Sequence, residues 1–318
     1  MKLFTQITKA LLITLIVPIA HAQAYPERPV KMVVPFPAGS ATDVGARIIG
    51  EHLQEHFHKA FVIENKPGAL GSIGAQIVAR SAPDGYTLLF SSNAIASTSA
   101  LMKNLPYDPL KDLAPVAGIA ESFLVLMVAP TFPAKTLEQF LAYAKENPDK
   151  LTGAYGSSTA QVSIALLNKL AGLKTLPVPY KGIPATVTDV IGGTVDFTFA
   201  DQGSAKAQSD SGRLRAIAIT SLKRNPLVPD LPAIAEVAPG YGVAPWLAIM
   251  GPANLPKSIT EELNGAVNKA LQDPEVKKKF AAIGLVPMQM PPKELKSFLE
   301  KEVALWKTLA KDANIEPQ

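Results

Sequence analysis

Residues 33–45 read VVPFPAGSATDVG, and this stretch joins an apolar run to the start of an amphipathic one. The run PVKMVVPF (29–36) lacks polar alternation, which is typical of a strand buried on both faces. Apolar residues then recur at helical spacing between 41 and 57, namely Val44, Ile48, Ile49, Leu53 and Phe57. The stretch therefore predicts a buried strand, a tight loop and a helix.

The same alternation continues along the chain. AFVIEN (60–65) and YTLLFSSN (86–93) predict two more strands, with a helix of small residues between them. An order of β-α-β-α-β is typical of a parallel sheet with helices on its faces. Later apolar runs repeat the pattern, among them LTGAY (151–155) and VDFTFAD (195–201). The sequence therefore predicts the α/β class.

Two further runs, ESFLVLMVAP (121–130) and PWLAIMGP (245–252), share one shape: an apolar strand that ends at a proline. If each crosses between two lobes, residues 25–124 plus 245–318 form one lobe and 125–244 form the other. We expect each lobe to hold a mostly parallel sheet flanked by helices. Ligands of open α/β sheets bind beyond the carboxyl ends of the strands, so we expect a ligand cleft between the lobes.

The first 24 residues differ from the rest of the chain. Lys2 and Lys9 flank the start of an apolar core, ALLITLIVPIA (10–20), and small residues follow it. The core is too short to span a bilayer, so a secretory signal peptide is favoured over a retained membrane anchor. We expect cleavage after Ala24, with Ala22 as the second option.

Charge and cysteine usage narrow the class of protein. The formal charge of +4 falls to +2 without the two signal lysines, and the basic residues are scattered. This argues against nucleic-acid or membrane-surface binding. The chain has no cysteine and 47% hydrophobic residues, so its core alone must stabilise it. Such a composition suits a large periplasmic protein.

The loop at 37–40 is a candidate ligand-binding loop. Ser40 and Asp43 fit a helix-capping pattern, and a plain helix start is the simplest interpretation. That interpretation does not explain the small residues before the cap, Pro37, Ala38 and Gly39. Small residues let a ligand approach free N–H groups at a helix N-terminus, which favour anions.

A second loop of this kind, GSSTAQ (156–161), occupies the matching place in the other predicted lobe. Asn93 ends a strand of the first lobe and Asp201 ends one of the second. Polar strand ends that converge from two lobes would hold a small molecule. The sequence therefore predicts a clamp with donors from both sides.

Several motifs together resemble the tripartite tricarboxylate transporter receptor family, the Bug extracytoplasmic solute-binding proteins. They are PFPAGSATD, ENKPGALGSIGAQIVARSAPDGYTLLF, LPYDPLKDLAPV, VPYKG, DVIGGTVDFTFAD and GRLRAIAITS. The resemblance covers the chain after residue 24. It implies a two-lobed flytrap like type II periplasmic binding proteins, in which backbone amides and ordered waters hold a carboxylate.

The resemblance also implies a set of ligand-binding residues. In this sequence they are Phe36, Ala38, Gly39, Ser40, Asp43, Asn93, Ser157, Ser158, Thr159, Gln161 and Asp201. Two of them depart from the family pattern. Ser40 stands where the family usually has a second glycine, and Gln161 stands where it often has a histidine.

The implied function is a periplasmic receptor, not an enzyme, that closes around a mono- or dicarboxylate or an aromatic acid. It would deliver this acid to the membrane subunits of a tripartite transporter, or present it to a membrane sensor kinase. We expect a monomer that needs no cofactor and binds no metal or nucleic acid.

Two enzyme interpretations of the sequence compete with the receptor interpretation. HLQEH (52–56) has the spacing of some zinc peptidases, with His52 and His56 as ligands and Glu55 as base. No motif supplies a third ligand, and a solvated helix end is the simpler interpretation. A serine hydrolase lacks a GxSxG motif. The glycines at 68, 71 and 74 do not have the spacing of a dinucleotide site, so we interpret them as glycines of helix packing.

Overall fold

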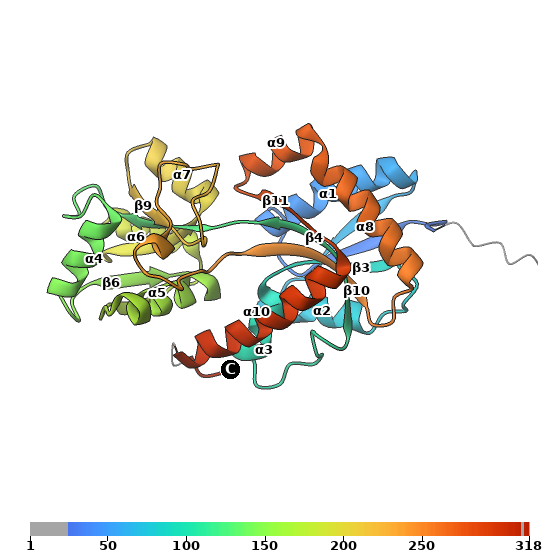
Figure 1. Cartoon of the computed structure of the whole chain (residues 1–318), viewed down its shortest axis with the longest axis horizontal. Helices are drawn as coiled ribbons and strands as arrows, with labels where there is room; N and C mark the ends of the chain where they lie inside the picture. Colours follow the sequence, from blue (N-terminus) through green and yellow to red (C-terminus); the bar gives the residue numbers. More distant parts are fainter. Residues whose placement is uncertain (1–24, 313–314, 318) are drawn as a thin grey trace, which may run out of the picture.

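The computed structural model describes residues 25–312 and 315–317. The predicted signal peptide, residues 1–24, lies outside the described residues. The described chain forms two sheets, each flanked by helices and set side by side along the long axis of the molecule (Figure 1). Lobe 1 denotes the part around the six-stranded sheet, and lobe 2 the part around the five-stranded sheet.

The sheet of lobe 1 has the strand order β11-β4-β10-β3-β1-β2. Strand β1, next to the edge strand β2, pairs in parallel with β2 and β3, whereas β10 pairs antiparallel with β3 and β4. Strand β11 is also antiparallel to β4. The bounds are β1 Val30–Val34, β2 Phe61–Asn65, β3 Thr87–Ser92, β4 Leu113–Glu121, β10 Trp246–Pro252 and β11 Val286–Met290.

The sheet of lobe 2 has the order β7-β6-β8-β5-β9. Strand β6 is parallel to β7 and β8, and β5 is antiparallel to β8 and β9. The bounds are β5 Leu124–Val128, β6 Thr152–Tyr155, β7 Leu176–Pro179, β8 Phe197–Asp201 and β9 Arg215–Ile219.

The α/β class and the two-lobed architecture are confirmed, but the expectation of mostly parallel sheets needs a correction. Both sheets are mixed, because β5 and β10, next to the two crossings between lobes, run antiparallel to their neighbours. The first crossing lies between Glu121 and Leu124, and the second precedes Trp246. The proposed lobe boundaries, 124/125 and 244/245, lie beside these crossings.

Helices cover both faces of each sheet (Figure 1). In lobe 1 they are α1 Ala41–Phe57, α2 Ser72–Ala79, α3 Ala94–Leu101, α8 Lys257–Gln272, α9 Pro274–Ala282 and α10 Pro292–Asp312, with the short 3-10 turn η1 Ala69–Gly71. In lobe 2 they are α4 Leu137–Glu146, α5 Ser158–Ala171, α6 Ile183–Ile191 and α7 Gln202–Asp210, with η2 Ile234–Glu236.

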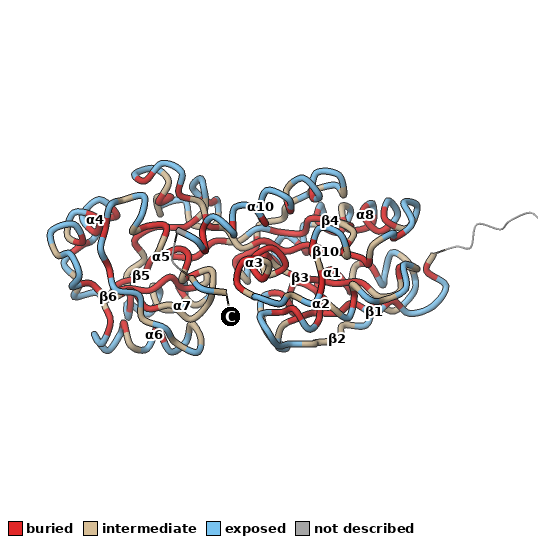
Figure 2. The backbone as a smooth tube through the Cα atoms, turned by 90° about the horizontal axis from the view of Figure 1, so that it is seen from below, coloured by how far each residue is buried: buried red, intermediate tan, exposed pale blue. Residues whose placement is uncertain are grey.

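Buried strands run through the middle of both lobes and across the junction between them (Figure 2). All five residues of β5 and all seven of β10 are buried, as expected for strands without polar alternation. The long helix α10 packs on α3 of lobe 1 and on α5 of lobe 2. A hydrogen bond of 2.8 Å joins α10 to the second crossing, because Trp246 Nε1 donates to the carboxylate of Glu302 in this helix.

Among residues 25–312 and 315–317, no helix combines the length and the hydropathy that a bilayer span requires.

Candidate functional site

The loop between β1 and α1 is the first part of the candidate site. Gly39 has a φ of 83°, a left-handed conformation that glycine adopts without strain. Ser40 caps α1, because its Oγ accepts a 3.2 Å hydrogen bond from the N–H of Asp43. The chain thus forms a capped helix start after a loop of small residues, as the sequence pattern predicts.

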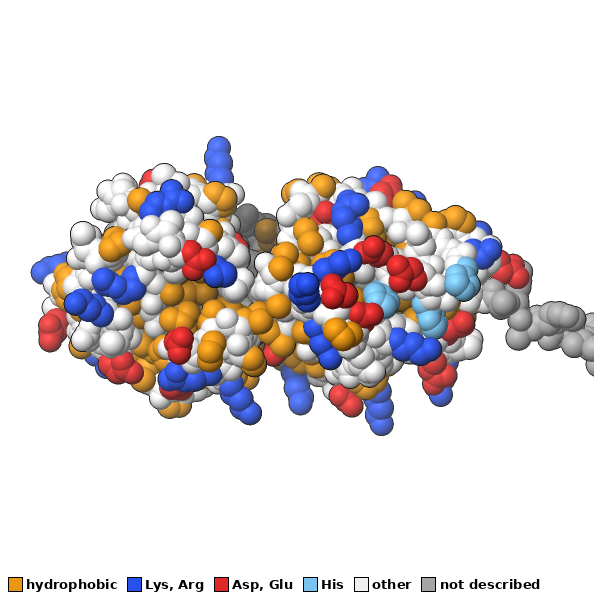
Figure 3. Space-filling view, turned by 90° about the horizontal axis from the view of Figure 1, so that it is seen from above, with side chains coloured by type: hydrophobic (Ala, Val, Ile, Leu, Met, Phe, Trp, Pro, Cys, Tyr) orange, Lys and Arg blue, Asp and Glu red, His pale blue; other side chains and the backbone are white. Residues whose placement is uncertain are grey.

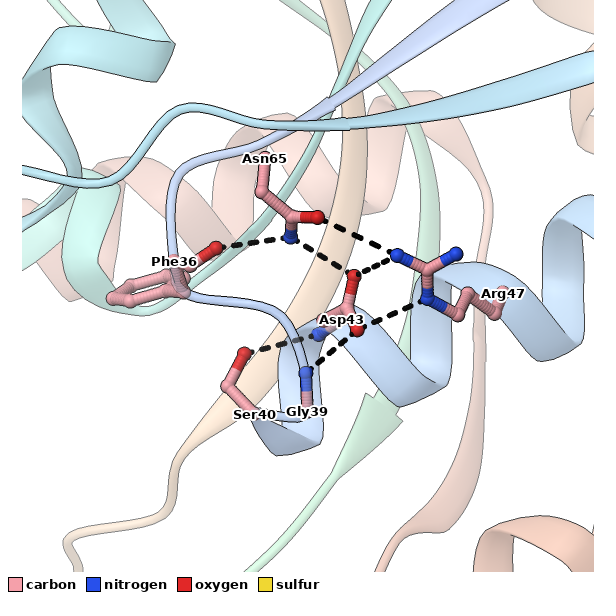
Figure 4. A network of polar contacts seen from close by, with 6 residues as sticks. All are labelled: Phe36, Gly39, Ser40, Asp43, Arg47 and Asn65. Carbon is pink, nitrogen blue, oxygen red and sulfur yellow. Dashed lines mark hydrogen bonds and ion pairs between the residues drawn. The ribbon is translucent and has the colours of Figure 1, made fainter.

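Asp43 holds this loop in shape. Its buried carboxylate accepts hydrogen bonds from Gly39 N–H at 2.8 Å, from Arg47 Nε and Nη2 at 3.0 Å each and from Asn65 Nδ2 at 2.9 Å (Figure 4). Asn65 also donates to the Phe36 carbonyl at 3.0 Å, which ties β2 to the loop. Four protein donors saturate the carboxylate, so Asp43 orders the loop and offers no free oxygen to a ligand.

The network also sets the charge state of Asp43. Burial on its own would raise the pKa of this carboxyl. The hydrogen bonds from Arg47, Gly39 and Asn65 outweigh burial and lower the pKa below its ordinary value. Asp43 is therefore ionised at neutral pH, next to a guanidinium that neutralises it.

The loop leaves specific backbone donors for a ligand. The Gly39 N–H donates to Asp43, and the Ser40 N–H donates to the Pro37 carbonyl at 3.2 Å, so neither is free. Within the described chain, the N–H groups of Ala41 and Thr42 in the first turn of α1 have no acceptor. These two donors point along the helix axis at its positive end, which favours an anion.

The second loop, between β6 and α5, repeats this design. Ser157 caps α5, because its Oγ accepts a 3.2 Å hydrogen bond from the N–H of Ala160. The N–H of Gln161 donates to the Ser157 carbonyl at 3.0 Å. The N–H groups of Ser158 and Thr159 have no acceptor in the described part of the chain, so they are the free donors of lobe 2.

Gly156 fixes the position of the second loop. A Cβ at this residue would lie 2.2 Å from the carbonyl carbon of Gly182 and 2.4 Å from the N of Ile183. Only glycine allows the loop at 156–158 to pack this closely on the segment before α6. The contact thereby sets the N-terminus of α5 against the start of α6.

A cavity of about 310 Å³ adjoins the second loop. Lobe 2 contributes the loop residues and two tyrosines, Tyr155 and Tyr180, to its wall. Lobe 1 contributes Leu70 and Leu101, and the C-terminal segment contributes Ile315 and Glu316. The volume lies at the lower end of the range of small-molecule sites. The cavity therefore lies between elements of both lobes.

The structure brings only some of the predicted site residues to this cavity. Ser157, Ser158 and Gln161 line it. Thr159 lies next to them in the first turn of α5. The first loop adjoins the cavity indirectly, because a Cβ at Gly71, next to Leu70, would lie 3.5 Å from Cζ of Phe36. Phe36, Ala38, Gly39, Ser40 and Asp43 are not part of its wall.

Both predicted strand-end residues lie at a helix N-terminus, but only Asp201 caps its helix with its side chain. Asp201 accepts hydrogen bonds from the N–H of Ser204 at 2.9 Å and from its Oγ at 2.7 Å, so it caps α7. Asn93 is buried at the start of α3, and its N–H donates to the Trp246 carbonyl at 3.0 Å. Neither side chain lines the cavity.

Sequence reasoning missed several residues of the cavity wall: Leu70, Leu101, Tyr155, Tyr180 and Ile315. A signal existed for the tyrosines, since Tyr155 ends the strand before the second loop and Tyr180 lies in the VPYKG motif. Leu101 and Ile315 carry no such signal, because packing of α3 and α10 alone brings them to the cavity.

The histidines considered as zinc ligands lie elsewhere. His52 Nε2 contacts Asp273 Oδ2 at 3.1 Å, and the ring of His56 packs edge-on against Phe57. In the described ranges no group of three potential metal ligands comes together. The histidine side chains in Figure 3 lie on the surface of lobe 1 among charged side chains, away from the junction.

Comparisons with known proteins give one consistent family. The model of the tripartite tricarboxylate transporter family receptor matches residues 45–315. Protein BugT of Bordetella pertussis is 36% identical over 290 residues, which cover 90% of this chain and 89% of BugT.

Two solved structures share the fold. R. palustris Rpa4515, solved with adipate, has a TM-score of 0.81 and 34% identity, and covers 92% of this chain and 100% of its own. MatC from Rhodopseudomonas palustris, solved with bound malate, has a TM-score of 0.74 and 31% identity, and covers 90% and 99% of the two chains. The chain belongs to the tripartite tricarboxylate transporter receptor family, a family of periplasmic solute-binding proteins and not of enzymes.

Proposed function

We propose that this protein captures a small carboxylated molecule between its lobes and delivers it to the membrane subunits of a tripartite transporter. The solute is a mono- or dicarboxylate or an aromatic acid. The N-terminal segment directs export to the periplasm and is cleaved after Ala24. The receptor acts as a monomer.

The observation that carries the proposal is the pair of free donor sets, one in each lobe. Ala41 and Thr42 offer two N–H groups at the start of α1, and Ser158 and Thr159 offer two at the start of α5. Each helix N-terminus also carries partial positive charge, which stabilises an anion without a basic side chain. A carboxylate, with two acceptor oxygens, suits such donors.

Binding and closure are coupled in this mechanism. A solute that contacts both donor sets stabilises the closed arrangement of the lobes over the open one. Asp43 and Gly156 contribute by keeping the two loops ordered before the solute arrives, which lowers the entropic cost of binding. The solved relatives with adipate and malate support the choice of an organic acid.

A thermal-shift screen of the purified protein tests this function. A true ligand at about 100 times its dissociation constant should stabilise the protein by about 2.7 kcal/mol. The screen should contain short aliphatic, hydroxylated and aromatic acids, each paired with its primary amide. The acids should raise the melting temperature and the matched amides should not. Equal shifts with acids and amides would contradict carboxylate recognition.

A further inference from the structure

We infer that Leu70 is a specificity-determining residue, and that the solute carries its carboxylate at one end only and an uncharged apolar body at the other. This inference deepens the proposed function and rests on it. It comes from the backbone around Leu70, from the apolar and aromatic residues of the cavity wall and from the charges along that wall.

Leu70 occupies a turn that disfavours a leucine. Four consecutive residues have positive φ angles, namely Gly68 at 130°, Ala69 at 45°, Leu70 at 55° and Gly71 at 91°. Such a conformation is uncommon for residues with a side chain, and glycine would adopt it without strain. Strained residues with side chains concentrate at ligand-binding sites.

The turn displays the leucine side chain at the cavity. Leu70 is 50% exposed although it is a large apolar residue, and it lines the cavity from lobe 1. A Cβ at Gly71 would lie 3.4 Å from Pro35 Cβ and 3.5 Å from Phe36 Cζ, so the turn lies beside the first loop. The strained turn therefore places an apolar side chain at the cavity, next to the first loop.

Four further apolar or aromatic residues line the cavity beside its polar ones. They are Leu101 and Ile315, and Tyr155 and Tyr180 of lobe 2. The hydroxyl of Tyr180 already donates to Asp189 at 2.6 Å, so the ring is what it offers to a solute. The aliphatic side chains of leucine and isoleucine and the rings of tyrosine suit a hydrocarbon or aromatic body.

The charges along the wall oppose a second carboxylate. No lysine or arginine lies among the described residues that line the cavity, whereas Glu316, an exposed acidic residue, does. In the proposed mechanism the donors at the starts of α1 and α5 together hold one carboxylate. A second carboxylate at the far end of the solute would lose its hydration among Leu70, Leu101 and Ile315 and would face Glu316.

Hexanoate and adipate test this inference, because both have six carbons and differ only in a methyl or a carboxylate at the far end. Isothermal titration of the purified protein should give hexanoate at least about tenfold higher affinity than adipate. The variant Leu70→Ala keeps a Cβ in the strained turn and removes the rest of the side chain. It should weaken hexanoate about five- to tenfold and leave adipate almost unchanged.

Leu222→Ala is the matched control, because Leu222 is 68% exposed and is not part of the cavity wall. It should bind hexanoate as the parent protein does. Adipate affinity equal to or above that of hexanoate, or hexanoate binding unaffected by Leu70→Ala, would overturn the inference and leave the proposed function standing. Absence of binding by hexanoate, adipate and benzoate alike would overturn the proposed function itself.

Discussion

Replacement of Asp43 by alanine is the most informative single change in the first loop. It removes the acceptor of four hydrogen bonds, from Gly39, Asn65 and twice from Arg47. Removing one partner of a buried charge pair costs about 3–5 kcal/mol. Because the Arg47 side chain is 53% exposed, water replaces part of the hydrogen bonding that Arg47 loses. We therefore expect the free energy of unfolding to fall by an amount near the lower end of this range, about 3 kcal/mol.

The same change should weaken solute binding through loss of loop order. Without Asp43 the Gly39 N–H loses its acceptor, and the donors of Ala41 and Thr42 are no longer held at a fixed place. We expect the affinity for the best acid of the screen to fall at least about tenfold. An added cost of about 1.4 kcal/mol for ordering the loop is enough to lower affinity tenfold.

Urea denaturation and isothermal titration measure the two effects, with Asp273→Ala as the control. Asp273 also caps a helix of lobe 1, since it accepts a 2.7 Å hydrogen bond from the N–H of Glu275, but its side chain is 34% exposed and contacts His52 away from the cavity. It should lose less stability and keep full affinity. A folded Asp43→Ala protein with unchanged affinity would refute a role of the first loop in binding.

Three further predictions concern pH, a loop glycine and the C-terminal helix. The Asp43 pKa is lowered in the folded state, so its stabilising effect is present above its unfolded pKa of about 3.9 and is lost as the pH falls through the folded value. The advantage of the parent protein over Asp43→Asn in urea denaturation should therefore shrink between pH 7 and pH 3, and an unchanged advantage would contradict the network. Gly156→Ala should abolish acid binding in titration, because its Cβ would clash with the backbone of Gly182 and Ile183. The control Gly265→Ala, with open space around it in α8, should raise the free energy of unfolding by about 0.5–1 kcal/mol. Normal acid binding by Gly156→Ala would contradict the close packing. Burial raises the pKa of Glu302 more than the hydrogen bond from Trp246 lowers it, so stability from this group is present below its unfolded pKa and is lost as the pH rises through the folded one. Glu302→Gln, which keeps an acceptor for Trp246, should be at least as stable as the parent in thermal melts at pH 8, and a clear loss of stability would show that the charge itself is needed.

The elements beside the first loop could be predicted from sequence because they depend on local patterns. The apolar run before Pro35, the capping residue Ser40 and the helical spacing of Ile48 and Leu53 each act within one or two turns. Asp43 also lies within reach of Arg47, four residues on, which a helical pattern implies. Its contact with Asn65 depends on the parallel register that pairs Val34 with Asn65, which no local pattern gives.

The mixed sheets could not be predicted in this way. Strands buried on both faces have the same apolar composition in parallel and antiparallel pairing, so β5 and β10 gave no sign of their direction. Helix α3, ASTSAL after Ala94 and Ile95, has small residues without a polar face, and the sequence pattern did not reveal it.

The cavity wall was the least predictable part of the site. The left-handed turn at Leu70 lies beside Pro35 and Phe36, residues more than thirty positions earlier in the chain, and no local pattern gives this contact. Ile315 reaches the cavity only because α10 spans the junction of the lobes. Glycines 68 and 71 pointed to helix packing in the sequence, but both belong to this turn.

A crystal structure with the acid that gives the largest thermal shift tests the central claim most directly. We expect closed lobes and carboxylate oxygens about 3 Å from the N–H groups of Ser158 or Thr159 and of Ala41 or Thr42. A carboxylate bound by a lysine or arginine side chain, or seated away from both helix N-termini, would contradict it.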